Sequence, residues 1–344
     1  MTRRYIYVLT GITLVVVFLM AFLHFNANNP KQRKHGFNRA VFKSGLVKLH
    51  SVNQSIVDVA GMHAGKLYLV TKDPGELLVT DTAFQNKQTI QLMIAVTNQL
   101  RSNFTTTLLD SFVYIAGHNV PSITRYDLST QTASEFKTDR AFSRFALLND
   151  QSAALRGFNA SFDDELFRKV NMPTATYIEE KDITDKTAGG GFVTDGMLHY
   201  DKRTGRVVYN FFYCNRLLFL DTNLNLLQTG NTIDTFKTYT AGAKAVRTTQ
   251  GVSYTFSKPP ELLSLHSCVS DGKLFIYSRL KADNDETEIY KNHTVIDVYD
   301  ILSGKYDGSL YVPGKRMLKF RVFDNRLYAI YPDALVTYQL TTLI

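Results

Sequence analysis

Basic side chains recur at equivalent places between the apolar segments of this sequence, and their chemistry stands out first. Guanidinium and ammonium groups that converge in a concave site attract and hold anionic ligands. Each connection between successive repeats carries at least one of them: Arg101, Arg140, Arg144, Lys186, Lys258 and Arg316. We expect these residues to form an electropositive funnel that binds an anionic small molecule or an acidic peptide segment. The alternative is that they are solvated loop charges, which are common on protein surfaces.

The histidines show no metal-binding spacing. The patterns H-E-x-x-H and C-x-x-C are both absent, and the eight histidines are scattered along the chain. Several fall in different repeats, where strand ends or loops are the expected positions: His63, His118, His199, His266 and His293. The sequence therefore predicts neither a metal site nor a bound cofactor.

Two further groups of residues were weighed for chemistry. The acidic stretch Ala282–Glu288, "ADNDETE", resembles part of a calcium loop but lacks the required Gly and terminal Glu. It is expected to be a solvated insertion, with weak ion binding as the alternative.

Cys214 and Cys268 are the only cysteines, and separate buried thiols or one disulfide both fit that number. The sequence also has no G-x-S-x-G elbow and no Walker loop, so linear motifs indicate no catalytic site.

The positive charge of the chain is concentrated at its N-terminal end. The net charge is +8, yet eight of the 39 Lys and Arg residues precede the first acidic residue, Asp58, and the other 31 match the 31 acidic residues. Nucleic-acid binding needs a basic patch on the folded domain, which this distribution does not provide. We therefore expect no nucleic-acid partner.

The N-terminal segment is the most apolar part of the chain. Tyr5–Phe25 holds no Asp, Glu, Lys or Arg over 21 residues, which as a helix is long enough for a bilayer core of about 30 Å. We expect residues 1–25 to be an uncleaved transmembrane anchor and residues 26–39 a polar basic linker, with a cleaved signal peptide as the alternative. Basic residues flank both ends of this segment, so the charges alone do not fix its orientation. We favour export of the remaining chain, and a cytoplasmic orientation is the alternative.

The remainder of the chain consists of repeated alternating segments that indicate β-strands. Strands of about five to eight residues, separated by turn residues, recur in groups of four at spacings of about 40 to 65 residues. Six repeats begin near Ile56, Thr105, Phe142, Gly191, Leu262 and Leu318. Four-stranded repeats at this period are typical of propeller blades. The last repeat lacks a fourth strand, which we expect residues 40–51 to supply.

The turn and strand motifs carry a family resemblance. "AGKLYLV" at Ala64–Val70, "DGKLFIY" at Asp271–Tyr277 and "DNRLYAI" at Asp324–Ile330 resemble the blades of six-bladed β-propellers of the broad TolB-like or NHL-like group, which includes membrane-tethered bacterial members. The resemblance covers residues 40–344 and implies an all-β six-bladed propeller. It also implies a bacterial inner-membrane protein with the propeller in the periplasm or another extracytoplasmic space.

Propellers of this shape serve as enzymes, binding modules and scaffolds, so the fold does not choose among them. The absence of catalytic motifs favours a non-enzymatic module that binds a ligand or assembles with a protein. The alternative is a hydrolase or lyase whose catalytic residues converge at the central channel. The longest connection, residues 238–261, is expected to form an extra hairpin, a lid over the channel or a docking arm.

Overall fold

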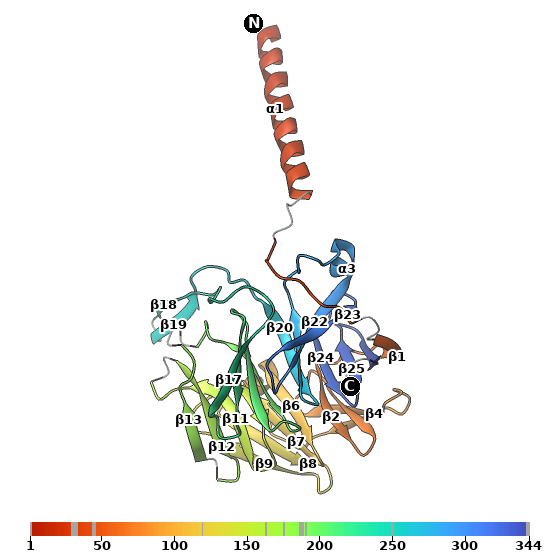
Figure 1. The fold of residues 1–344 in the computed structure, drawn as a ribbon, viewed down its shortest axis with the longest axis vertical. Helices are drawn as coiled ribbons and strands as arrows, with labels where there is room; N and C mark the ends of the chain where they lie inside the picture. The colour runs from red at the N-terminus through yellow and green to blue at the C-terminus, as the bar shows by residue number, and fades with distance from the viewer. Residues whose placement is uncertain are drawn as a thin grey trace.

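The computed structural model shows an all-β propeller of six blades, as the repeats predict (Figure 1). It describes residues 2–28, 34–42, 46–118, 120–161, 164–174, 176–185, 189, 191–248 and 251–341. Each blade is a four-stranded antiparallel sheet whose neighbouring strands are joined by hydrogen bonds. The fold therefore follows from the alternating patterns. Apolar side chains on the faces of a blade are buried only when that blade packs against its neighbours.

Five blades take their four strands in sequence order from the innermost to the outermost. Blade 1 contains β2 (Asp58–His63), β3 (Lys66–Val70), β4 (Glu76–Asp81) and β5 (Gln88–Gln91). Blade 2 contains β6 (Phe104–Leu109), β7 (Phe112–Gly117), β8 (Ser122–Asp127) and β9 (Thr132–Lys137). Blade 3 contains β10 (Phe142–Leu147), β11 (Ser152–Phe158), β12 (Glu165–Asn171) and β13 (Thr176–Lys181). Blade 4 contains β14 (Gly196–Asp201), β15 (Arg206–Phe211), β16 (Arg216–Leu220) and β17 (Leu226–Asn231). Blade 5 contains β20 (Ser264–Ser270), β21 (Lys273–Ser278), β22 (His293–Asp300) and β23 (Tyr306–Pro313).

Blade 6 closes the ring with strands from both ends of the chain. Its inner strands are β24 (Lys319–Phe323), β25 (Arg326–Ile330) and β26 (Leu335–Leu340), and its outer strand is β1 (Leu46–Val52). β1 pairs antiparallel with β26, from Leu46 opposite Leu340 to Val52 opposite Leu335. The expectation that a segment upstream of the first repeat supplies the missing strand is confirmed, and the pairing protects the edge of β26.

The hydrophobic core lies between the blades. One buried cluster occupies each interface between neighbouring blades; between blades 5 and 6, for example, Phe320 and Val322 of β24 pack with Val298 of β22 and Leu310 of β23. Full burial of such a side chain contributes roughly 1.5 to 3 kcal/mol. These interfaces fix the positions of the inner strands around the axis.

A short N-terminal segment, residues 34–42, lies against blade 5, and we call it the strap. Phe37 packs with Leu263, Leu280 and Ala282, while the main chain at Ala40 and Phe42 exchanges hydrogen bonds with Ser309 of β23. Part of the expected linker, from His35 to Arg39, therefore makes specific contacts with the propeller.

Arg39 of the strap is buried in blade 5. Its guanidinium lies 2.5 Å from Asp285 and 2.9 Å from Asp297, and it also donates to Ser278 Oγ. Burial alone would lower the pKa of Arg39, but the two carboxylates outweigh it and raise that pKa. The prediction that Ala282–Glu288 is a solvated insertion is wrong at Asp285, because this carboxylate is the partner of a buried arginine. Arg39 itself is 5% exposed, so this basic residue of the expected linker is not a solvated charge.

The N-terminal helix α1 (Thr2–Asn28) extends away from the blades, at the top of Figure 1. Among the residues that the structure describes, no helix is both long and apolar enough to cross a membrane. The helical conformation expected for this segment is therefore present, whereas its transmembrane role is not supported.

Two insertions lie on the side of the ring from which α1 extends: the hairpin of β18 (Ala243–Thr248) and β19 (Gly251–Phe256) before β20, and α3 (Thr287–Asn292) before β22 (Figure 1). A further short helix, α2 (Asn98–Ser102), precedes β6. The long connection thus forms an extra hairpin, one of the three expectations.

Cys214 and Cys268 are both buried free thiols, and burial raises their pKa values to about 11 and about 12.

Candidate functional site

The inner strands of all six blades line a cavity of about 560 Å³ in the central channel. We call it the entry chamber, because part of its lining, such as Phe104, Met197, Leu265 and Leu318, lies at the starts of these strands, where the connections between blades arrive. A second cavity of about 420 Å³, the rear chamber, is lined toward the other ends of the inner strands. Thr107, Tyr200, Val269 and Arg321 border both chambers, so the two adjoin at these residues.

Strand geometry determines which side chains reach the entry chamber. In β24 burial alternates, so Lys319 and Arg321 face the channel while Phe320 and Val322 enter the core between the blades. In β10 and β20 a register shift comes immediately before Arg144 and His266. Such a β-bulge inserts an extra residue and changes the direction of the next side chain. Both of these polar residues line the cavity.

Several polar residues of the chamber join neighbouring blades. Arg144 of blade 3 donates to both carboxylate oxygens of Asp195, at 2.8 Å each, and to the Gly196 carbonyl of blade 4. His199 of blade 4 lies 2.7 Å from Ser267 Oγ of blade 5, and His266 Nε2 lies 3.0 Å from the Phe320 carbonyl of blade 6. These side chains have partners within the fold, so a structural role accounts for them.

Asp58, Lys319 and Arg321 form a cluster with excess positive charge. Arg321 donates through Nε and Nη2 to the two oxygens of Asp58, at 2.8 and 3.0 Å, and Lys319 Nζ lies 3.4 Å from the same carboxylate. Burial alone would raise the pKa of Asp58, but these two cations outweigh it and hold that pKa far below its usual range. Two cations thus face one carboxylate.

The three histidines of the chamber are neutral at pH 7. Burial, with smaller contributions from Arg144 and Lys319, lowers the pKa of His118 to about 4. Burial and the charge of Arg321 lower the pKa of His266 to about 3, and burial places that of His199 well below its ordinary value. His118 Nε2 contacts Thr105 Oγ1 at 2.8 Å, whereas its buried Nδ1 has no hydrogen-bond partner among the described residues.

The basic residues singled out in the sequence lie in different surroundings. Arg144 lines the entry chamber; Arg101 pairs with Asp73 at 2.9 Å; Arg140 pairs with Asp139 and Glu180. Lys258 and Arg316 are exposed and do not line the chamber described here, and Lys186 falls outside the described residues. The funnel of loop charges stays a prediction, while the cations of the cavity come mainly from strand β24.

Sequence reasoning missed the residues that do converge. His118, His199 and His266 were expected to be scattered, yet all three line the same chamber together with Asp58, Lys319 and Arg321. Among the described residues, no group of three or more His, Cys, Asp or Glu is arranged to hold a metal ion. A usable signal was present in the sequence, because the first strands of five repeats carry a charged residue or a histidine amid apolar ones: Asp58, Arg144, His199, His266, and Lys319 with Arg321.

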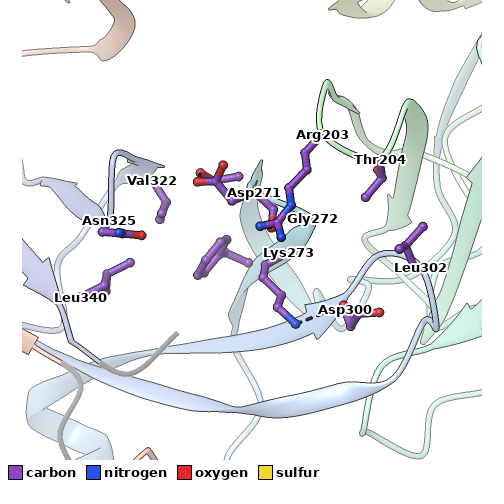
Figure 2. A pocket seen from close by; sticks show the side chains of 12 residues that line it. Arg203, Thr204, Asp271, Gly272, Lys273, Asp300, Leu302, Val322, Asn325 and Leu340 are labelled. Atoms are coloured by element: carbon purple, nitrogen blue, oxygen red, sulfur yellow. Dashed lines mark hydrogen bonds and ion pairs between the residues drawn. The ribbon is translucent and has the colours of Figure 1, made fainter. Parts of the chain in front are cut away.

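A smaller cavity of about 290 Å³ lies at the opposite ends of the inner strands, between the turns of blades 4, 5 and 6 (Figure 2). Its charged groups already bind one another. Lys273 Nζ lies 3.1 Å from Asp300 and 2.8 Å from Asp307, and Arg203 donates to the Asp271 carbonyl at 3.0 Å. This cavity therefore offers a ligand less unsatisfied charge than the entry chamber does.

Comparisons with known proteins support the fold. No protein-family model matches the sequence, and no curated protein gives a significant match. The crystal structure of a member of the DUF4221 family from Bacteroides vulgatus is similar with a TM-score of 0.55 and 13% identity, over 90% of this chain and 99% of that one. A structural-genomics protein of unknown function from Bacteroides thetaiotaomicron gives 0.51 and 10%, over 90% and 73%. At these identities the likeness shows the fold alone.

Proposed function

We propose that this protein is a binding module whose entry chamber holds a small anionic ligand. The observation that carries the proposal is the cluster of Lys319 and Arg321 around the single carboxylate of Asp58. In a partly enclosed cavity, an unbalanced positive charge attracts anions more strongly than it would in open solvent. The ligand would take the Lys319 ammonium and the Arg321 guanidinium as its first partners.

The remaining polar groups support binding over chemistry. Arg144, His199 and His266 hold neighbouring blades together, and their hydrogen bonds are satisfied within the fold. The neutral His118 also lines the chamber and adds a polar, uncharged side chain to its wall. A hydrolase or lyase with residues converging at this channel is the alternative, and turnover of a bound anion would favour it.

We also propose that α1 attaches the propeller to a membrane, with the propeller on the extracytoplasmic side. Support comes from the large apolar side chains that α1 exposes, such as Tyr7 at 75% and Phe18 at 73%. Exposed apolar surface of this extent usually meets a membrane or a partner protein. The narrower resemblance to the TolB-like or NHL-like group would agree with this placement and stays a prediction.

The substitution Lys319→Gln tests the binding proposal. Calorimetric titration of the purified protein with acetate, hexanoate, succinate and inorganic phosphate is expected to show binding of at least one anion, and no binding of the uncharged acetamide and hexanamide. Loss of a charge-assisted hydrogen bond should weaken that binding about ten- to a hundred-fold.

Lys258→Gln is the matched control, because Lys258 is exposed and does not line the chamber. Lys319 is itself partly exposed, so its substitution should leave the fold intact. The proposal fails if no anion binds, or if Lys319→Gln and Lys258→Gln leave the affinity equally unchanged.

A further inference from the structure

We infer that the ligand of the entry chamber is an organic acid with an apolar body, bound with its anionic group inward and its hydrocarbon part at the mouth. This inference rests on the proposed function and specifies its ligand. It follows from exposed apolar side chains at the mouth of the chamber together with a cation, Arg321, at its deep end, a combination that an inorganic anion would not exploit.

Apolar side chains surround the mouth of the chamber. Phe104, Met197, Leu265 and Leu318 each lie at or next to the first residue of an inner strand, and all four line the cavity. Leu318 is 50% exposed and Leu265 is 38% exposed. Leucines at a concave opening remain in contact with water unless a ligand covers them. We call these four residues the apolar rim.

Arg321 lies further in than the rim. Arg321 borders both the entry and the rear chamber, which places it at the deep end of the entry chamber, and its partner Asp58 is buried. Lys319 stands between Leu318 of the rim and Arg321 in the sequence of the same strand. Lys319 is the first residue of β24, so an anionic group that reaches Arg321 passes both the rim and Lys319, and any atoms attached to it remain beside the rim side chains.

The size of the chamber agrees with such a ligand. Small-molecule sites commonly have volumes of about 300 to 1,000 Å³ and combine mainly apolar walls with a few placed polar groups. At about 560 Å³ the entry chamber falls in this range. A bare phosphate or acetate would fill only a small part of it, whereas a carboxylate with a chain of several carbons would also cover the rim.

A chain-length series tests the inference. Affinities of the protein for acetate, butanoate, hexanoate and octanoate are measured by calorimetry at one pH and salt concentration. Each methylene that reaches the rim should tighten binding by roughly fourfold, the value that corresponds to burial of a methylene in an apolar site. Equal affinities for acetate and octanoate would overturn the inference while leaving the proposed anion site intact.

The paired substitution Leu265→Ser and Leu318→Ser locates the effect. It should abolish most of the gain with chain length and leave the affinity for acetate unchanged, because the charged cluster is not altered. Leu226→Ser is the control, since Leu226 is a 45%-exposed leucine on the outer strand of blade 4, away from the channel. A chain-length gain that survives the paired substitution would overturn the assignment to the rim. Failure of every anion to bind would instead count against the proposed function.

Discussion

At the scale of single residues, the channel histidines determine how the propeller responds to acid. His266 is 5% exposed, donates from Nε2 to the Phe320 carbonyl of the neighbouring blade, and has its pKa lowered to about 3. In the unfolded chain the same imidazole titrates near 6.5. Between these two values the unfolded state binds more protons than the folded state, so stability falls as the pH falls through this range.

His266→Asn should therefore reduce the dependence of stability on pH. As the pH falls from 6.5 to about 4, the free energy of unfolding should decrease less steeply in the variant than in the wild type. The two slopes should differ by roughly 1.4 kcal/mol per pH unit. Urea unfolding at several pH values measures this slope. Burial raises the pKa values of Glu165 and Asp195, so these two groups make the folded state more stable as the pH falls. Their contribution is the same in the wild type and in the variant. Parallel slopes in that range would show that His266 is not a source of the acid sensitivity.

At the scale of elements, the strap joins blade 5 through a buried ionic cluster. Arg39 lies between Asp285 in the loop before α3 and Asp297 in β22, and the side chains of all three are almost fully buried. Ser309 Oγ and Tyr311 donate further hydrogen bonds to these carboxylates. Removal of the arginine would leave two carboxylates without a cation, which is costly in a buried position.

Arg39→Ala should lower the free energy of unfolding by about 3 to 5 kcal/mol. Chemical denaturation provides the measurement. Lys34→Ala in the same strap is the control, because Lys34 is exposed and its loss should have little effect. Combining Arg39→Met with Asp285→Asn and Asp297→Asn should recover part of the stability, because no buried charge is then unpaired. A small effect of Arg39→Ala alone would contradict the role assigned to this cluster.

At the scale of the whole molecule, α1, the β18–β19 hairpin and α3 lie on one side of the ring (Figure 1), and the hairpin belongs to the connection between blades 4 and 5. Residues at the starts of the inner strands, where such connections arrive, line the mouth of the entry chamber. If α1 attaches to a membrane, the mouth of the chamber faces that membrane, and an organic acid with a hydrocarbon part would reach it from the lipid surface as well as from solution.

Reporter fusions test the placement of the propeller. A reporter active only outside the cytoplasm, fused after Ile344, should be active, and a reporter active only inside should not. Deletion of residues 2–28 should abolish the external signal and release the protein from the membrane fraction. Activity of the internal reporter alone would reverse the proposed orientation, and membrane association that survives the deletion would remove the role of α1.

The sequence predicted the blades well because local alternation and turn residues repeat six times. "DNRLYAI" and "DGKLFIY" each mark a tight turn into a strand, and both strands, β25 and β21, have the expected position in their blades. Closure by β1 was also predictable, since the sixth repeat visibly lacks a strand. These features depend on patterns within a few residues or on counting repeats.

The site was harder to predict, for two physical reasons. Which side chains face the channel depends on bulges such as those before Arg144 and His266, and a bulge leaves no simple mark in the pattern of apolar residues. The partners are also distant in sequence: Asp58 meets Arg321 across the closure of the ring, and Arg39 meets Asp285 and Asp297. Before the fold was known, Arg39 counted as a linker charge and the three channel histidines as unrelated.

The pairing of β1 with β26 has a consequence for synthesis of the chain. Leu46 of β1 pairs with Leu340 of β26, so the N-terminal strand leaves the ribosome long before its partner strand has been synthesised. Blades 1 to 5 can form one after another as their hairpins emerge, but the last interfaces complete only when β26 has been translated. Until then the strand must stay unpaired without aggregating. Its charged and polar residues, Lys48, His50 and Ser51, are suited to that interval because they are exposed and interrupt its apolar positions.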